Sequence, residues 1–226
     1  MRALFTAKPA ILWTLTSHAL NMCQTLGYHR LHTLKHDTPL MRQQKIWMFW
    51  TLYMASQAAS LRLGRTSVMS DYDISIPVPQ PDQNTFNRFA NGVVRCMHFS
   101  RIQGKIYEVL YSHSALSQPG QVRAQRAIML AEELKAVFLH MRRDQKRVRE
   151  RWDHAYHVQL EIEACTTELT YYIILTLILR AIPVTPGSRT SLSPECLSAA
   201  RTDFRKHAEF MPVICKAFPA DVYFKA

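Results

Sequence analysis

The segment Ile46-Trp47-Met48-Phe49-Trp50-Thr51-Leu52-Tyr53 places four aromatic side chains within seven residues. Aromatic side chains bury large apolar areas, so the helix that carries this segment is expected at the centre of the core. Upstream, Thr38 offers an N-cap hydroxyl, and Pro39 suits the first helical position, where its missing N–H is not needed. Downstream, Gly64 suits the left-handed residue that ends many helices. We therefore predict one helix from Pro39 to about Gly64.

A second helix is predicted on the N-terminal side of this segment, from Ile11 to Leu26. Its apolar residues recur at intervals of three and four, the spacing of one buried helical face, and Gly27 follows as a helix stop. The predicted buried face comprises Ile11, Leu15, Ala19, Met22, Cys23 and Leu26.

On the C-terminal side, residues 71–81 contain three prolines and are predicted to form a loop, because proline restricts both itself and the residue before it. Apolar spacing predicts further helices from about Asn84 and from about Gln121. The helix predicted over residues 152–182 is apolar on all sides near residues 172–179, as a buried central helix would be.

A last helix is predicted to begin at Pro194, with Ser193 as its cap. Its expected buried residues are Leu197, Phe204, Ala208 and Ile214. No segment shows the alternation typical of strands. The predicted fold class is therefore all-α, a single irregular multi-helix bundle that forms one domain over residues 1–226. Within it, residues 11–81 carry the distinctive motifs and residues 84–226 form a helical continuation.

The composition excludes several classes of protein. The chain has 226 residues, 48% of them hydrophobic, which suffices for a core without disulfide or metal staples. The longest apolar run, Leu169 to Leu179, is shorter than the roughly 20 residues that span a bilayer, so no membrane partner is expected. The five cysteines lie too far apart for a metal knuckle and are expected to be reduced thiols in an intracellular protein: Cys23, Cys96, Cys165, Cys196 and Cys215.

Sequence motifs of catalysis are not found: the chain has no G-x-S-x-G, H-E-x-x-H, P-loop or G-x-G-x-x-G sequence. We therefore expect no enzyme activity and no cofactor in this chain. Two histidine sets have spacings that a metal could use on a helix, His29/His32/His36 and His154/His157 with Glu161. In a chain with a net charge of +11, both are more typical of a solvated surface.

The strongest charge feature is the run from Arg142 to Arg151. On a helix its cations wrap around the axis, which favours a solvated, ion-paired helix end. The alternatives are contact with an acidic partner protein, contact with a nuclear import receptor, or sequence-independent binding to nucleic-acid phosphates. The candidate basic patch comprises Arg142, Arg143, Lys146, Arg147, Arg149 and Arg151.

Four short motifs occur in order along the first third of the chain. Leu26-Gly27-Tyr28-His29-Arg30 precedes the aromatic segment, and Ser60-Leu61-Arg62-Leu63-Gly64-Arg65 and Asp71-Tyr72-Asp73-Ile74 follow it. This series resembles the fungal-specific transcription factor domain, the "middle homology" regulatory region of binuclear zinc-cluster (zinc–six-cysteine) activators. The resemblance covers about residues 13–81.

The resemblance implies that the motif residues are structural. Asp71 and Asp73 are expected to pair with Arg62 or Arg65 and so hold the proline loop against the bundle. At Ser56-Gln57 the chain departs from the acidic and basic pair typical of the family, so local packing is expected to differ. The motif residues are Leu26, Gly27, His29, Arg30, Trp47, Phe49, Trp50, Tyr53, Ser60, Leu63, Gly64, Arg65, Asp71, Asp73 and Ile74.

The resemblance also implies a nuclear regulator of RNA polymerase II transcription. DNA binding and its zinc ions would belong to an amino-terminal cysteine module whose C-x-x-C signature this chain lacks. The resemblance begins close to Met1, so the first helices of the family domain are expected to be absent. Expected partners are a second copy, transcriptional co-regulators and a small-molecule inducer. The alternatives are an orphan interaction module that binds a full-length factor, and a helical ligand-binding protein.

Overall fold

The computed structural model describes residues 9–80, 88–184 and 191–217, and within these ranges it contains helices and no strand. The all-α prediction is confirmed. The chain divides into two compact units, unit 1 (Met1–Gln118) and unit 2 (Pro119–Ala226). The prediction of a single domain over residues 1–226 stays a prediction.

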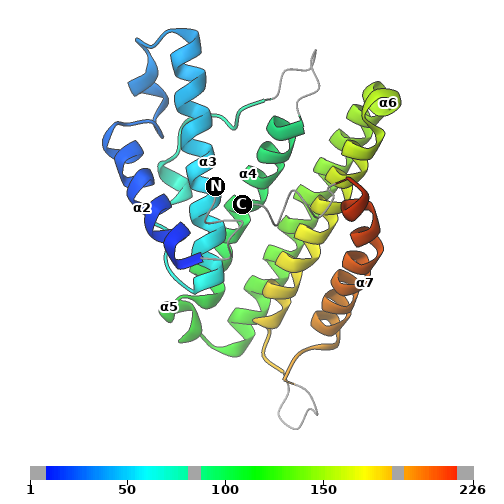
Figure 1. The fold of residues 1–226 in the computed structure, drawn as a ribbon. Coiled ribbons are helices and arrows are strands. Elements are labelled where there is room, and N and C mark those ends of the chain that lie inside the picture. The colour runs from blue at the N-terminus through cyan, green and yellow to red at the C-terminus, as the bar shows by residue number, and fades with distance from the viewer. Residues whose placement is uncertain (1–8, 81–87, 185–190, 218–226) are drawn as a thin grey trace. The chain divides into compact units, whose positions relative to one another are not determined.

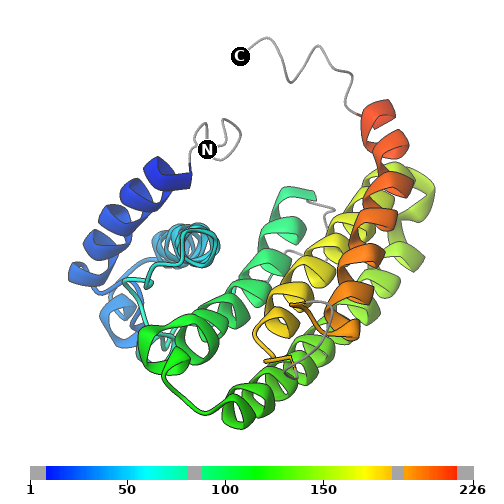
Figure 2. The ribbon, with the colours of Figure 1, turned by 90° about the horizontal axis from the view of Figure 1, so that it is seen from below.

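Unit 1 begins with helix α2 (Pro9–Thr25), the 3₁₀ turn η1 (Leu31–Leu34) and the long helix α3 (Pro39–Leu63). A second 3₁₀ turn η2 (Asp71–Asp73), helix α4 (Arg88–Ile106), a π-helical turn η3 (Tyr107–Tyr111) and the short helix α5 (His113–Leu116) follow. The predicted start of a helix at Asn84 lies outside the described residues. Helices α2, α3 and α4 pack successively against one another (Figures 1 and 2).

Helix α3 has the bounds that the sequence predicts, because local groups set both of its ends. The Thr38 hydroxyl accepts a hydrogen bond from the Met41 N–H at 3.3 Å, and Pro39 is the first helical residue. Gly64 has φ 62° and ψ 38°, and the Arg65 N–H donates to the Ser60 carbonyl at 2.9 Å. This left-handed cap satisfies carbonyl groups that the helix end leaves without partners.

The predicted buried face of α2 is wrong. Ile11, Leu15, Met22 and Leu26 are about half exposed or more, and of the predicted set only Cys23 is fully buried. The buried face lies on the adjacent side of the helix and comprises Leu12, Thr16, Ser17, Leu20 and Cys23. Thr16 can be buried because its hydroxyl donates to the Leu12 carbonyl at 2.7 Å within the helix.

Unit 2 is built from helix α6 (Gly120–Arg180) and helix α7 (Pro194–Ala217). Tyr156 has non-helical dihedral angles (φ −134°, ψ 27°), and there α6 turns back on itself as two antiparallel arms (Figure 1). The break was predicted four residues earlier, at Trp152. Gln145 joins the arms by donating to the Glu163 carbonyl at 3.2 Å and to the Thr167 hydroxyl at 2.8 Å.

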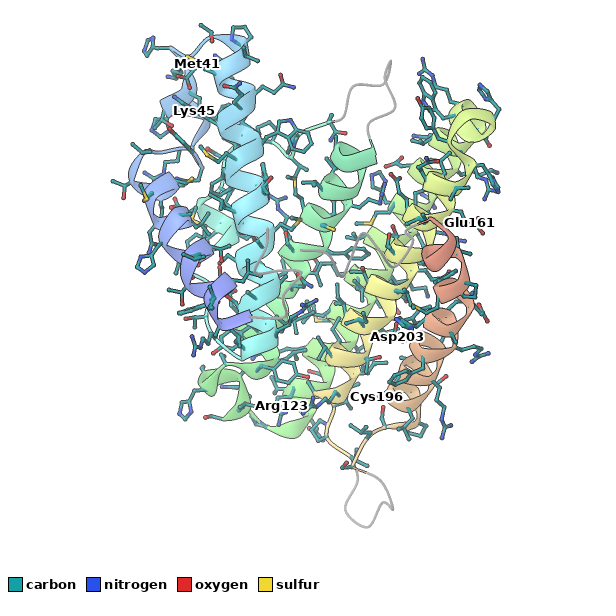
Figure 3. The ribbon with its side chains drawn as sticks, in the orientation of Figure 1. Met41, Lys45, Arg123, Glu161, Cys196 and Asp203 are labelled. Atoms are coloured by element: carbon teal, nitrogen blue, oxygen red, sulfur yellow. The ribbon has the colours of Figure 1, made fainter. Side chains whose placement is uncertain are left out.

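Helix α7 starts as predicted, with the Ser193 hydroxyl accepting from the Cys196 N–H at 3.1 Å and Pro194 as its first residue. Cys196, labelled in Figure 3, is buried against the second arm of α6. The predicted burial of Phe204 and Ala208 is wrong: Phe204 is 76% exposed and Ala208 is also exposed, whereas Ala199 is buried. The side chain of Ile214 lies outside the described residues.

The second arm of α6 is also less buried than predicted, since Ile173 is half exposed although Ile174 and Ile178 are fully buried. The segment Tyr156–Arg180 is long and apolar enough to cross a membrane, as core helices of soluble domains also are. The absence of a membrane partner stays a prediction.

Candidate functional site

The aromatic segment of α3 forms the centre of the core of unit 1. Phe49, Trp50 and Tyr53 have no exposed surface, and their ring centroids lie 5.3–6.1 Å apart in stacked and edge-to-face pairs. Leu20 and Cys23 of α2 belong to the same cluster, so these rings hold α2 against α3. Trp47 and Ile74 are partly buried and pack on its edge.

A second set of contacts ties the segment after α3 to these rings. The Trp50 indole N–H donates to the Pro77 carbonyl at 2.8 Å, and the Tyr53 hydroxyl donates to the Asp71 carboxylate at 3.1 Å. Arg101 of α4 lies 3.2 Å from Asp71 and stacks over the Trp50 ring. Burial raises the pKa of Tyr53, and the neighbouring Asp71 carboxylate adds to the shift, so this hydroxyl stays a proton donor.

The motif residues of the loop after α2 meet the loop after α3 in what we call the clamp, formed by His29, Arg30, Leu31, Asp73 and Ser75. The Arg30 guanidinium lies 2.8 Å from the Asp73 carboxylate, and His29 Nε2 lies 3.3 Å from it. The Ser75 N–H donates to the His29 carbonyl at 3.0 Å, and the Leu31 N–H donates to the Ser75 hydroxyl at 2.9 Å. The clamp therefore joins segments more than 40 residues apart.

Two ionisable groups of the clamp have shifted pKa values. The hydrogen bond from Arg30 lowers the pKa of the Asp73 carboxyl group. Burial lowers the pKa of His29, which is only 3% exposed and lies beside the Phe49 ring, and the attraction of Asp73 opposes this shift only in part. The clamp thus favours an ionised Asp73 and a neutral His29.

The predicted partners of the two aspartates are wrong. Asp71 pairs with Arg101 and Asp73 pairs with Arg30, not with Arg62 or Arg65. Arg65 instead stacks over the Trp13 ring at 4.6 Å. Sequence reasoning missed Arg101 and Trp13, because neither lies in a motif; their roles arise from the packing of α4 and α2 on α3.

The other motif residues serve the ends of helices. Ser60 is buried and its hydroxyl accepts from the Trp13 indole N–H at 3.1 Å, while Leu63 is half-buried in the last turn of α3. Gly27 has φ 73°, and a Cβ there would lie 2.7 Å from the Thr33 methyl group, so both backbone and space require glycine. Leu26, by contrast, is mostly exposed.

The departure at Ser56-Gln57 has a structural consequence. Both residues are buried, and the Gln57 amide donates to the Met69 carbonyl at 3.3 Å. A Cβ on Gly104 of α4 would lie 2.9 Å from the Gln57 amide oxygen. The uncharged Gln57 therefore fills a site where α3 and α4 approach closely. The expected difference in local packing from other family members stays a prediction.

The candidate basic patch lies next to the turn between the two arms of α6, and all six of its cations are exposed. Arg147 lies 3.5 Å from Asp144. Lys146 lies 4.0 Å from Glu150, and Arg142 lies 4.0 Å from Glu168. Arg151 stacks over the Trp152 ring. This partial ion pairing fits a solvated helix end, and a role of the patch in binding stays a prediction.

The two histidine sets do not come together as ligand clusters among the described residues. Across the described residues, no three His, Cys, Asp or Glu side chains are close enough to hold an ion. His29, expected on a solvated surface, is instead buried and lies 3.3 Å from Asp73, and His157 lies 4.0 Å from Glu161. Cys23, Cys96, Cys165 and Cys196 are free thiols, and the expectation that the chain holds no zinc stays a prediction.

A buried aromatic helix, two left-handed glycines at helix ends and the clamp characterise the all-α unit 1, and the comparisons with known proteins identify its family. The family model of the fungal specific transcription factor domain matches residues 1–139, so the chain belongs to this family. No solved structure matches the chain.

Among curated proteins, the chain is similar to an ABC-transporter-regulating transcription factor of Aspergillus fumigatus, with 25% identity over 126 residues. It is also similar to the negative regulator of pleiotropic drug resistance STB5 of Candida glabrata, with 26% identity over 114 residues. These matches cover 50% and 49% of this chain, but only 14% and 11% of the two relatives. The relatives are transcription regulators, which supports the same general role for this chain.

Proposed function

We propose that this chain is the regulatory part of a fungal nuclear transcription factor that controls transcription by RNA polymerase II. The observation that carries the proposal is the family match over residues 1–139, which contains the motif residues of the aromatic core and the clamp. The transcription-regulator names of the two similar proteins support it.

In this proposal another part of a longer protein supplies DNA binding through a zinc-cluster module, which would also hold the zinc ions. The chain itself would contribute contacts to co-regulators, to a second copy or to a small-molecule inducer. The expectation that it is not an enzyme agrees with the role of its relatives and stays a prediction.

A reporter experiment tests the regulatory role. Residues 1–226 are fused to a bacterial repressor's DNA-binding module and expressed in a fungal strain whose reporter gene carries the matching operator. We expect reporter transcription to differ from that with the DNA-binding module alone, and the fusion to accumulate in the nucleus. Unchanged transcription at equal protein abundance would contradict the proposal.

Two aromatic variants provide matched controls for this experiment. Trp50→Ala removes a ring with no exposed surface and should abolish the effect, because large cavities in a core cost about 3–5 kcal/mol. Tyr72→Ala removes a ring that is 92% exposed and should leave the effect intact. Immunoblots of both fusions separate a loss of regulation from a loss of protein.

A further inference from the structure

A surface depression of about 460 Å³ opens beside the clamp, and we call it the clamp pocket. Its lining residues are Leu31, His32, Lys35, Arg42 and Ser75. They come from three separate segments: η1 with the residue that follows it, the first turn of α3, and the loop after η2. The volume falls within the range of about 300–1,000 Å³ that is typical of small-molecule sites.

The charge of the clamp pocket is positive. Lys35 and Arg42 line it, and none of its lining residues is a carboxylate. The nearest carboxylates in the sequence, Asp37 and Asp73, are already paired: Lys45 lies 2.7 Å from Asp37, and Arg30 lies 2.8 Å from Asp73. Figure 3 labels Lys45 in the first part of α3, above the aromatic segment. The two lining cations therefore face a depression without a counter-charge of its own.

The pocket also has hydrogen-bond donors that the protein does not use. Arg42 is half-buried, and its Nε and one Nη donate to the Leu34 and Lys35 carbonyls at 3.2 and 3.3 Å. These bonds fix the guanidinium and leave its other N–H groups available. The Ser75 hydroxyl accepts from the Leu31 N–H and retains its own proton to donate. Within the described ranges, Lys35 has no acceptor or carboxylate partner.

We propose that the clamp pocket binds a small phosphate monoester, with the phosphate held by Lys35, Arg42 and Ser75 and an apolar substituent against Leu31. Phosphate is the matching anion because its oxygens accept several charge-assisted hydrogen bonds at once, and a guanidinium fork and an ammonium group donate them. Leu31 is 47% exposed and supplies the apolar wall. The phosphate monoester can be a free metabolite or a lipid headgroup.

The binding of such a ligand would strengthen the clamp, since Leu31 and Ser75 line the pocket and also form one of the bonds that hold the two loops together. The idea that this controls transcription rests on the proposed function. The binding itself does not, so the purified chain tests it without any reporter gene.

The test is a calorimetric titration of the full chain with hexyl phosphate, and hexanol serves as the uncharged comparison. We expect saturable binding of hexyl phosphate and none of hexanol. Lys35→Glu should weaken the binding at least about tenfold, because it removes a charge-assisted contact and adds repulsion. Lys35 is exposed, so this variant should keep the thermal midpoint of the unliganded protein.

Lys135→Glu is the matched control, since Lys135 is also exposed, lies on α6 and gives the same change in net charge. Its affinity should equal that of the unmodified chain. An equal loss in both variants would reveal non-specific attraction and overturn the proposal. Vesicles with and without phosphatidic acid form a second arm of the test.

Lys35-dependent binding to hexyl phosphate but not to the acidic vesicles identifies a free metabolite as the source of the ligand, and Lys35-dependent binding only to the acidic vesicles identifies a lipid headgroup. Lys35-dependent binding in both arms shows that the pocket accepts the phosphate monoester from either source. The absence of Lys35-dependent binding in both arms overturns the proposal. That result would leave the reporter experiment unaffected, so the two proposals can fail separately.

Discussion

At the scale of single residues, the two left-handed glycines of unit 1 have different surroundings. Gly27 and Gly64 have φ values of 73° and 62°. A Cβ at Gly27 would meet Thr33, whereas a Cβ at Gly64 would have no heavy atom within 4 Å. Thr33 cannot easily move away, because its hydroxyl donates to the Gly27 and Arg30 carbonyls.

We predict that Gly27→Ala destabilises the protein more than Gly64→Ala. The left-handed backbone alone costs about 1–2 kcal/mol for alanine, and the clash at Gly27 adds about 1–3 kcal/mol of overpacking. Urea denaturation of both variants measures the difference in the free energy of unfolding. Equal destabilisation would show that the contact with Thr33 relaxes at little cost.

The clamp predicts how stability depends on pH. Burial lowers the pKa of His29 from its ordinary value of 6.5, so the unfolded chain takes up a proton at a higher pH than the folded chain does. The stabilisation is therefore fully present above pH 6.5 and is lost as the pH falls below this value through the folded pKa. The pKa of Asp73 is also lowered in the folded chain, so its contribution to stability is likewise lost as the pH falls below its ordinary pKa of 3.8.

We expect the free energy of unfolding to fall between about pH 7.5 and pH 5.5, and His29→Gln to remove part of this fall. Urea denaturation at a series of pH values measures both effects. His36→Gln removes an exposed histidine of the same loop and should keep the full pH dependence. If the free energy of unfolding of the His29 variant decreased with falling pH as steeply as that of the unmodified chain, other groups would be responsible for the pH dependence.

At the scale of elements, α2 carries apolar residues on two faces and buries only one of them. Leu20 has no exposed surface and belongs to the aromatic cluster, whereas Leu15 is 61% exposed. The same residue type in the same helix therefore has two different surroundings.

We predict that Leu20→Ala costs about 2–5 kcal/mol of stability, because it leaves a cavity beside the aromatic rings. Leu15→Ala should change stability by no more than about 0.5 kcal/mol, as is usual for exposed positions. Both changes have the same helix propensity, so the difference between their urea midpoints reports burial alone. A larger loss of stability for Leu15→Ala than for Leu20→Ala would show that the face predicted from the apolar spacing is the buried one.

At the scale of the whole molecule, the family match and the compact units have different bounds. The match ends at residue 139, within the first arm of α6, while unit 1 ends at Gln118. All the motif residues lie in unit 1, and the candidate basic patch lies in unit 2, beyond the matched range. The clamp pocket and the basic patch therefore belong to different units.

Local sequence chemistry is sufficient to place the ends of several helices. Thr38, Pro39, Gly64 and Ser193 act on the backbone within a few residues, so their effects can be read without knowledge of the fold. The aromatic segment likewise identified the core of unit 1, because rings of that size in one helix have to be buried together.

Which face of α2 is buried, and which cations contact Asp71 and Asp73, depends on how the helices pack in three dimensions. Leu12 and Ile11 are neighbours of similar hydrophobicity, so periodicity alone could not choose between their faces. Arg30 and Arg101 lie far from their partners along the chain and reach them only through helix packing. The clamp pocket has the same origin, since its lining comes from three segments that only the packed fold brings together.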